Sequence, residues 1–133
     1  MTEAAFDLSS TIVHLGLGST AVPVADLAWT SEWLDAYGAR FASDGDDGRL
    51  VCITQQDATW PTWERHPAGE EVVVVLEGRV DVIQDIDGEH RVVALHAGEA
   101  MVNPRGVWHT ADVHEPGRGL FITPGRGTEH RPR

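Results

Sequence analysis

The sequence contains no lysine, so its ten basic residues are all arginines. A chain without lysine cannot form a lysine Schiff base and cannot supply the lysine of a phosphate-binding P-loop, which excludes both kinds of chemistry. Against those ten arginines stand 21 acidic residues, and the formal net charge is −11. Because such a charge repels phosphate backbones and anionic lipid surfaces, we expect neither a nucleic-acid partner nor a membrane partner.

Cysteines and long apolar runs are also scarce. Cys52 is the only cysteine, so no disulfide can form within the chain, and we interpret this residue as a small member of the core. No stretch approaches the roughly 20 apolar residues of a membrane helix. The start, MTEAAFDLSS, lacks the positive charge and the apolar run of a signal peptide. The sequence therefore predicts a cytoplasmic protein.

The 133 residues suffice for one structural domain with one core, and two segments of different character compose it. The first, residues 1–48, holds a candidate edge strand in TIVHLGL and one short helix in TSEWLDAYGARF. Thr30 or Ser31 is the candidate N-cap of that helix. We predict that residues 1–48 form a strand and helix extension that packs on a β-barrel made by residues 49–133.

From Arg49 onward, short segments rich in β-branched residues follow one another between Gly, Pro and Asp. Asp87-Gly88 is a typical two-residue hairpin turn, and Glu77-Gly78 is expected to end a strand. This pattern, without helices between the strands, predicts an all-β antiparallel sandwich or barrel. Residues 72–75 are all valine, so one face of that strand fills the interior. A second subunit would cover the other face, and we expect a homodimer.

Two predicted hairpins carry the residues with chemical potential. Glu64 and His66 lie two positions apart on a strand and therefore point to the same side, and after a turn Glu71 begins the next strand opposite them. On the second hairpin, His109 shares its face with aliphatic residues. A buried imidazole without a partner costs about 1–3 kcal/mol. A metal ion shared with the first hairpin would supply that partner.

These two segments resemble the two motifs of the cupin superfamily. The first motif, counted from its second histidine, is H-x4-E-x6-G, and the second is G-x5-P-x-G-x2-H-x3-N. The resemblance spans residues 58–113 and implies a cupin-type double-stranded β-helix, or jelly-roll barrel, with a divalent metal and a small-molecule substrate or ligand. The positions that keep the spacing of the two motifs are His66, Glu71 and Gly78, then Gly98, Pro104, Gly106 and His109.

The sequence departs from the family pattern at Glu64, where the first motif usually has a histidine; the motif's opening glycine and closing asparagine are also replaced, by Ala58 and Val113. By resemblance the metal ligands would be Glu64, His66, Glu71 and His109. The added carboxylate favours Fe²⁺ or Mn²⁺, with Zn²⁺ and Ni²⁺ as alternatives. In the alternative interpretation Glu64 does not ligate: His66, Glu71 and His109 then form a set of two histidines and one carboxylate, and Glu64 acts as a catalytic general base or orienting residue. It also has the simpler alternatives of pairing with a nearby arginine, Arg65 or Arg105, or pointing to water.

Other interpretations concern the neighbouring residues. Trp60 and Trp108 lie beside the candidate ligands and are candidates for the walls of a substrate pocket, while Trp33 and Tyr37 are candidates for a lid. The ligands themselves also have structural alternatives, a surface ion pair for His66 and Glu71 and a backbone-bonded core histidine for His109. The remaining histidines are expected to be solvated, the last of them in an exposed and mobile tail; they are His14, His90, His96, His114 and His130.

The sequence leaves two classes of function open. In the first, the protein is a metal-dependent enzyme that acts on a small organic substrate, either as a dioxygenase or as an isomerase or lyase, and Glu64 moves a proton. In the second, it is a non-catalytic cupin that binds a small ligand or a metal. No motif records the substrate, because the walls of a barrel pocket come from alternate positions on many strands.

Overall fold

The structure is a computed structural model that describes residues 4–133, so the first three residues of the predicted extension lie outside the described part. Within residues 4–133, nine strands form one strongly curled antiparallel sheet. The strands are β1 (Ile12–Gly16), β2 (Thr20–Val24), β3 (Arg49–Gln56), β4 (Thr62–Arg65), β5 (Glu71–Ile86), β6 (Glu89–His96), β7 (Ala100–Asn103), β8 (Trp108–Thr123) and β9 (Glu129–Pro132). The helices are α1 (Ser31–Arg40) and two 3₁₀ segments, η1 (Leu17–Ser19) and η2 (Ala42–Asp47).

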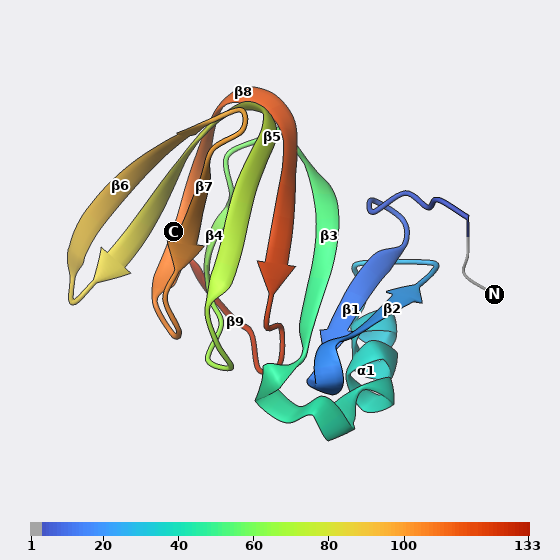
Figure 1. The fold of residues 1–133 in the computed structure, drawn as a ribbon. Coiled ribbons are helices and arrows are strands. Elements are labelled where there is room, and N and C mark those ends of the chain that lie inside the picture. Colours follow the sequence, from blue (N-terminus) through green and yellow to red (C-terminus); the bar gives the residue numbers. More distant parts are fainter. Residues whose placement is uncertain (1–3) are drawn as a thin grey trace.

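Two long strands, β5 and β8, form the central pair of the barrel sheet. Each has 16 residues, and the two pair with each other over most of their length. In Figure 1 both bend over the same end of the sheet. β3 and β4 pair with β8, while β6 and β7 pair with β5. The prediction of an all-β barrel is thereby confirmed.

The expectation that Glu77-Gly78 ends a strand is wrong, because β5 continues through both residues. The pairing of β5 with β8 shifts register here, and Gly78 has a φ of 91°, so the glycine forms a β-bulge rather than a strand end. The bulge changes which alternate positions face inward. Before it Val73 and Val75 are buried, and after it Val80 and Val82 are, so both halves of β5 fill the same interior.

The β5–β6 hairpin follows the sequence prediction. Asp87 and Gly88 both have positive φ values, 53° and 86°, as a two-residue turn of this kind requires. They connect Ile86 to its cross-strand partner Glu89.

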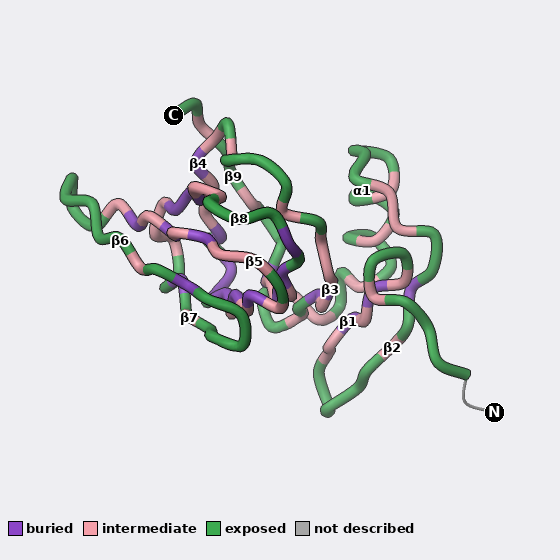
Figure 2. The backbone as a smooth tube through the Cα atoms, turned by 90° about the horizontal axis from the view of Figure 1, so that it is seen from above, coloured by how far each residue is buried: buried purple, intermediate pink, exposed green. Residues whose placement is uncertain are grey.

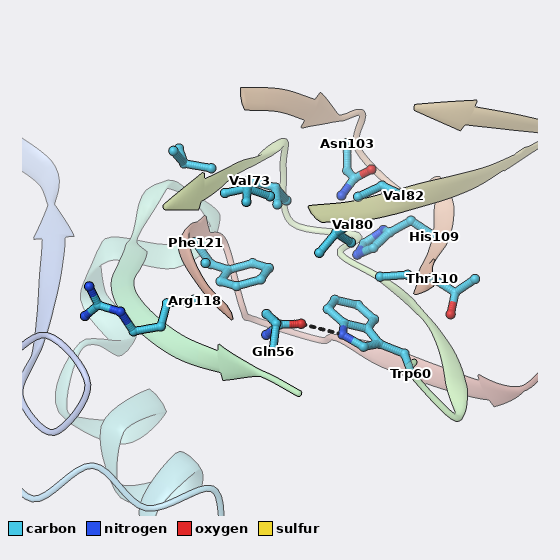
Figure 3. Close-up of a pocket in the computed structure, with 14 residues that line it drawn as sticks. Gln56, Trp60, Val73, Val80, Val82, Asn103, His109, Thr110, Arg118 and Phe121 are labelled. Atoms are coloured by element: carbon cyan, nitrogen blue, oxygen red, sulfur yellow. Dashed lines mark hydrogen bonds between the residues drawn. The ribbon is translucent and has the colours of Figure 1, made fainter. Parts of the chain in front are cut away.

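The barrel interior is mostly apolar around Trp60. Figure 3 shows Phe121 and three valines around Trp60, whose indole Nε1 donates to the side-chain oxygen of Gln56 at 2.8 Å. The cavity between them has a volume of about 20 Å³, room for roughly one water molecule. His109 also lines it, with its ring centroid 6.2 Å from that of Trp60, so the imidazole has the apolar core on one side.

The N-terminal segment lies beside the β3 edge of the barrel, as Figures 1 and 2 both show. β1 pairs with β3, for example Val13 with Val51, and thus extends the barrel sheet. The predicted helix is confirmed as α1, with Thr30 as its N-cap accepting the backbone N–H of Trp33 at 3.2 Å. None of the residues of α1 is buried. In the part of the chain that the structure describes, no helix is long and apolar enough to cross a membrane.

The C-terminal segment is not the mobile tail that the sequence suggested. Residues 129–132 form β9, which pairs with β4 and places His130 directly opposite Glu64. An ion pair between Arg65 and Glu129, at 2.9 Å, joins the same two strands. The C-terminal segment is ordered because it pairs with the edge of β4. The His130 side chain itself is largely exposed.

Candidate metal centre

Two hairpins bring the four predicted residues to one end of the barrel. Glu64 lies near the end of β4, His66 one residue beyond it, and Glu71 begins β5. His109 is the second residue of β8, opposite Glu64 in the β4–β8 pairing. The backbone N–H of Gly106 donates to the carbonyl of His66 at 3.0 Å and ties one hairpin to the other.

The distances between these side chains suit ligands of a single metal ion. His66 Nε2 lies 3.2 Å from a Glu64 oxygen and 3.1 Å from Glu71 Oε2, and His109 Nε2 lies 3.3 Å from Glu71 Oε1. Two ligand atoms each about 2.1 Å from one ion, at angles of about 90–110°, are about 3.0–3.4 Å apart. Glu64, His66 and His109 also offer ligand atoms that all lie within 4.8 Å of one another.

Hydrogen bonds place a proton on Nδ1 of both imidazoles. Thr128 Oγ1 donates its only proton to the Gly125 carbonyl, so it accepts from His66 Nδ1, at 2.9 Å. His109 Nδ1 donates to the carbonyl of Val107 at 3.2 Å. In the neutral imidazole each Nε2 is the nitrogen left to bind a metal, and within residues 4–133 both Nε2 atoms are buried without a hydrogen-bond partner. Metal-binding histidines in proteins typically have this arrangement.

Glu71 is buried and ionised between the two histidines. Asn103 Nδ2 donates to one of its oxygens at 3.1 Å and Thr123 Oγ1 to the other at 2.7 Å. Burial raises the pKa of Glu71, but its contacts with His109 and His66 more than offset this and bring the pKa well below its usual range. For His109, burial lowers the pKa and the contact with Glu71 raises it above its ordinary value. A fixed negative charge at this depth attracts a cation.

Glu64 differs from Glu71 in its surroundings. Its side chain is 24% exposed, and its second oxygen lies 3.8 Å from Nε2 of His130. Of the two arginines expected as alternative partners, Arg65 and Arg105, Arg65 pairs with Glu129 instead. Glu64 therefore lies between the buried cluster and the open side of the site.

A cavity of about 760 Å³ opens on this cluster and extends to α1. Trp60 lines it. Trp108 does not, because it alternates with inward-facing His109 on β8. Its ring lies between the guanidinium groups of Arg65 and Arg131, at 4.6 and 4.5 Å from the ring centroid. Of the two candidate lid residues, Tyr37 lines the cavity.

Several functional contacts were missed by sequence reasoning. Asn103, Thr123 and Thr128 hold the candidate ligands, yet each reaches them from a distant part of the chain, and the only local signal was the position of Asn103 before a turn proline. The expectation that His14 is solvated is wrong. It is 3% exposed, because pairing of β1 with β3 turns it inward beneath Tyr37 of α1.

The fold and the cluster together define a β-barrel protein with a histidine and carboxylate centre at one end. Residues 49–123, more than half of the chain, match the family model of the cupin domain, and the chain belongs to the cupin family. The resemblance seen in the motifs is thereby confirmed, and the barrel is a cupin barrel. No curated protein matches the sequence.

Solved structures show the same fold at low identity. Hydroquinone 1,2-dioxygenase PnpCD, in complex with Cd²⁺ and 4-hydroxybenzonitrile, has a TM-score of 0.51 at 20% identity, covering 56% of this chain and 56% of that chain. Peruvianin-I, a cysteine peptidase from Thevetia peruviana latex, has a TM-score of 0.52 at 16% identity, covering 64% and 55%. A cupin-2 domain protein from Shewanella frigidimarina has a TM-score of 0.48 at 24% identity, covering 64% and 71%. The chain thus spans little more than half of the first two proteins, and these similarities concern the fold alone.

Proposed function

We propose that this cupin binds one divalent metal ion through Glu64, His66, Glu71 and His109 and uses it as an enzyme on a small organic substrate. The observation that carries the proposal is the pair of buried Nε2 atoms, on His66 and His109, which face two carboxylates and have no hydrogen-bond partner. Left without a partner, each would cost about 1–3 kcal/mol, which a metal ion would relieve.

The ligand set favours Fe²⁺ or Mn²⁺, since two carboxylate ligands suit harder ions, and Zn²⁺ or Ni²⁺ are the alternatives. When bound, such an ion polarises an oxygen donor of the substrate as a Lewis acid or, in the case of iron, activates O₂. The reaction class is accordingly that of a dioxygenase, or of an isomerase or lyase. We also propose a cytoplasmic location, and the net charge of −11 favours small organic molecules over nucleic acids as substrates.

Glu64 is the residue we propose to move the proton in this reaction. Asn103 and Thr123 hold both oxygens of Glu71, which supports the role of a ligand for that carboxylate. Glu64 has no such donors, lines the cavity and is partly exposed, so its carboxylate can meet a substrate proton. The same residue can ligate through one oxygen, which contacts His66, and act as a base through the other.

Metal analysis tests the proposal directly. Protein purified without a histidine tag is analysed by plasma mass spectrometry, before and after incubation with Fe²⁺, Mn²⁺, Zn²⁺ and Ni²⁺. We expect close to one equivalent of metal per chain in wild type and far less in His66→Ala. Less than about a tenth of an equivalent in wild type, even after reloading, contradicts both the metal site and the enzyme.

Turnover separates the enzyme from a non-catalytic cupin. The metal-loaded protein is tested with a panel of diketones, catechols and thiols, while oxygen uptake and substrate absorbance are followed together. Substrate loss with oxygen uptake identifies a dioxygenase, and substrate loss without it an isomerase or lyase. Stoichiometric metal and tight ligand binding without turnover would favour the second class, a cupin that binds a small ligand and does not catalyse.

A further inference from the structure

A second polar cluster lies on the wall of the same cavity, away from the candidate metal ligands. It joins three elements: His14 from β1, Tyr37 from α1 and Asp44 from η2. His14 Nε2 lies 2.7 Å from Asp44 Oδ2, and its Nδ1 is hydrogen-bonded to the hydroxyl of Tyr37. His14 and Tyr37 both line the cavity, whereas Asp44 lies behind them.

The direction of these hydrogen bonds follows from Asp44. Its carboxylate accepts from His14 and from the backbone N–H of Leu17, and both bonds hold the pKa of Asp44 below its usual range. The ionised carboxylate can only accept, so Nε2 of His14 carries the proton. In neutral imidazole, Nδ1 then accepts the proton of the Tyr37 hydroxyl. Because its proton is used in this bond, the phenol oxygen of Tyr37 can only accept a further hydrogen bond.

Two glycines leave space for this cluster. A Cβ on Gly48 would lie 2.8 Å from the His14 ring, and a Cβ on Gly16 would lie 2.6 Å from Asp44 Oδ2. Neither glycine is needed for its backbone conformation, since Gly48 has φ −70° and Gly16 has φ −118°, which other residues readily adopt. Their small size is required by the side chains of the cluster.

The rest of the cavity wall is suited to a flat apolar body. Aromatic and aliphatic side chains line it between α1 and the candidate metal centre, and they include Trp29, Phe41, Leu50, Trp60 and Phe121. The acidic groups at the metal end, Glu64 and Glu71, favour a ligand that enters uncharged. Such walls with a hydrogen-bond acceptor fit a ring compound that carries a hydroxyl group.

We propose that Tyr37, backed by His14 and Asp44, accepts the proton of a hydroxyl group on a small hydroxylated ring compound bound in this cavity. This inference rests on the proposed metal-dependent function and names its substrate class. Tyr37 is the catalytic residue, because it touches the substrate. His14 and Asp44 are positioning residues that act through it.

The proton transfer balances within the three side chains and the substrate. The substrate O–H bond breaks as a new O–H bond forms on Tyr37, and the original Tyr37 proton passes to Nδ1 of His14. The products are the substrate anion and an imidazolium paired with the Asp44 carboxylate, so total charge is unchanged. No oxidant or further reactant takes part in this step.

The test uses 4-nitrocatechol, a ring compound whose absorbance reports its deprotonation. Wild type and Tyr37→Phe, both loaded with Mn²⁺ and free of oxygen, are titrated with the probe at one fixed pH. We expect Tyr37→Phe to bind the probe about tenfold more weakly, since it loses one hydrogen bond to a hydroxyl, and to hold a smaller deprotonated fraction. Asp44→Asn should retain most of the affinity but lower the deprotonated fraction.

The matched control is Trp33→Phe. Trp33 stacks on Tyr37, with ring centroids 5.5 Å apart, yet does not line the cavity, so this variant disturbs the helix packing without removing a polar group. It should bind and deprotonate the probe as wild type does. An equal loss in Trp33→Phe and Tyr37→Phe would show that the cluster only anchors α1, and would overturn the proposal.

Metal content, measured on the same samples, distinguishes this inference from the function on which it rests. If wild type takes up no metal, both fall. If metal-loaded wild type does not bind 4-nitrocatechol, or if metal-loaded Tyr37→Phe binds and deprotonates it like wild type, only the role of Tyr37 falls and the metal site stands. Should Tyr37→Phe fail to fold, the Asp44→Asn variant tests the role of Tyr37 in its place. A deprotonated fraction equal to that of wild type would contradict the proposal, and a lower fraction would support it.

Discussion

At the scale of single residues, the different environments of Glu64 and Glu71 suit the two carboxylates to different roles in the proposed site. Glu71 is buried and held by two neutral donors, whereas Glu64 is partly exposed and lies near the imidazoles of His66 and His130. We expect Glu64→Gln to weaken metal binding by at least about tenfold and to abolish turnover, because it removes both a ligand charge and a base. A chelator competition titration measures the affinity. Unchanged affinity with lost turnover would assign Glu64 as a base alone.

Thr128 controls the orientation of His66. Its hydroxyl accepts from His66 Nδ1 and so keeps Nε2 oriented toward the carboxylates. Thr128→Val removes this acceptor and is expected to lower metal affinity about 10–100-fold, the usual effect of losing such a partner. Thr128→Ser keeps the hydroxyl and is the control. Equal affinities for the valine and serine variants, in the same competition titration, would argue against this role.

Cys52 lines the cavity but should be unreactive. Burial raises the pKa of its thiol to about 12, with Glu71 and Glu64 contributing, so the neutral thiol predominates at any ordinary pH. We expect the folded protein to react with a thiol reagent such as dithionitrobenzoate at pH 8 far more slowly than the protein unfolded in urea. Rapid modification of the native protein would show that the thiol is ionised, and would contradict the burial argument.

At the scale of elements, the close pairing of β5 with β8 at the bulge requires a glycine. A Cβ on Gly117 would lie 1.9 Å from the backbone oxygen of Glu77, which cannot move without breaking the bulge. Gly117→Ala is expected to destabilise the fold by about 3 kcal/mol or more. Gly38 in α1 has no atom within 4 Å of such a Cβ, so Gly38→Ala should stabilise by up to about 1 kcal/mol. Urea denaturation of both variants measures the difference.

The sequence predicted elements well where the signal was local. The start of the strand-rich part at Arg49, the N-cap of α1 and the turn at Asp87 depend on neighbouring residues only, and all three were readable. The predictions were wrong where pairing with a strand distant in the sequence determines the local structure. From the sequence alone Gly78 resembles a strand end, but in the structure β5 pairs with β8 on both sides of it. Residues 129–132 likewise resemble a tail, but they pair with β4.

The candidate site shows the same division. Strand alternation and motif spacing were enough to predict that Glu64, His66, Glu71 and His109 would converge, and the structure brings them together. Their role as metal ligands stays a prediction. The side chains that hydrogen-bond to His66 and Glu71, and those that hydrogen-bond to His14, come from 23 or more positions away, and one sequence holds no pairing signal for them.

At the scale of the whole molecule, the cavity unites three remote segments of the chain. The N-terminal extension supplies Tyr37, the barrel supplies His66, and the C-terminal segment supplies Thr128 and His130. A cupin barrel alone therefore gives the metal end of this cavity but not its opposite wall. Differences in substrate between small cupins can arise in such added segments while the barrel stays the same.

The outer face of the barrel bears on the oligomeric state, which stays a prediction. The β-bulge in β5 brings Val72 and Ile83 to this face, where their cross-strand partners are Val102 and Val92. Val92 and Val102 are 58% and 49% exposed, a cost that burial against a second copy would relieve. We expect a homodimer at micromolar concentration, measured by size-exclusion chromatography with light scattering.

A charge placed on this face should break the dimer. Val102→Asp introduces a desolvation cost of several kcal/mol at a buried interface, so this variant should elute as a monomer with an unchanged circular dichroism spectrum. Leu17→Asp is the matched control, because Leu17 is similarly exposed at 53% but lies on η1, away from the outer face. If wild type is only monomeric, the interpretation of residues 72–75 as an interface strand is wrong. If Leu17→Asp dissociates the dimer instead, the two copies meet through the N-terminal extension, and the cavity beside α1 would then have a second subunit at its rim.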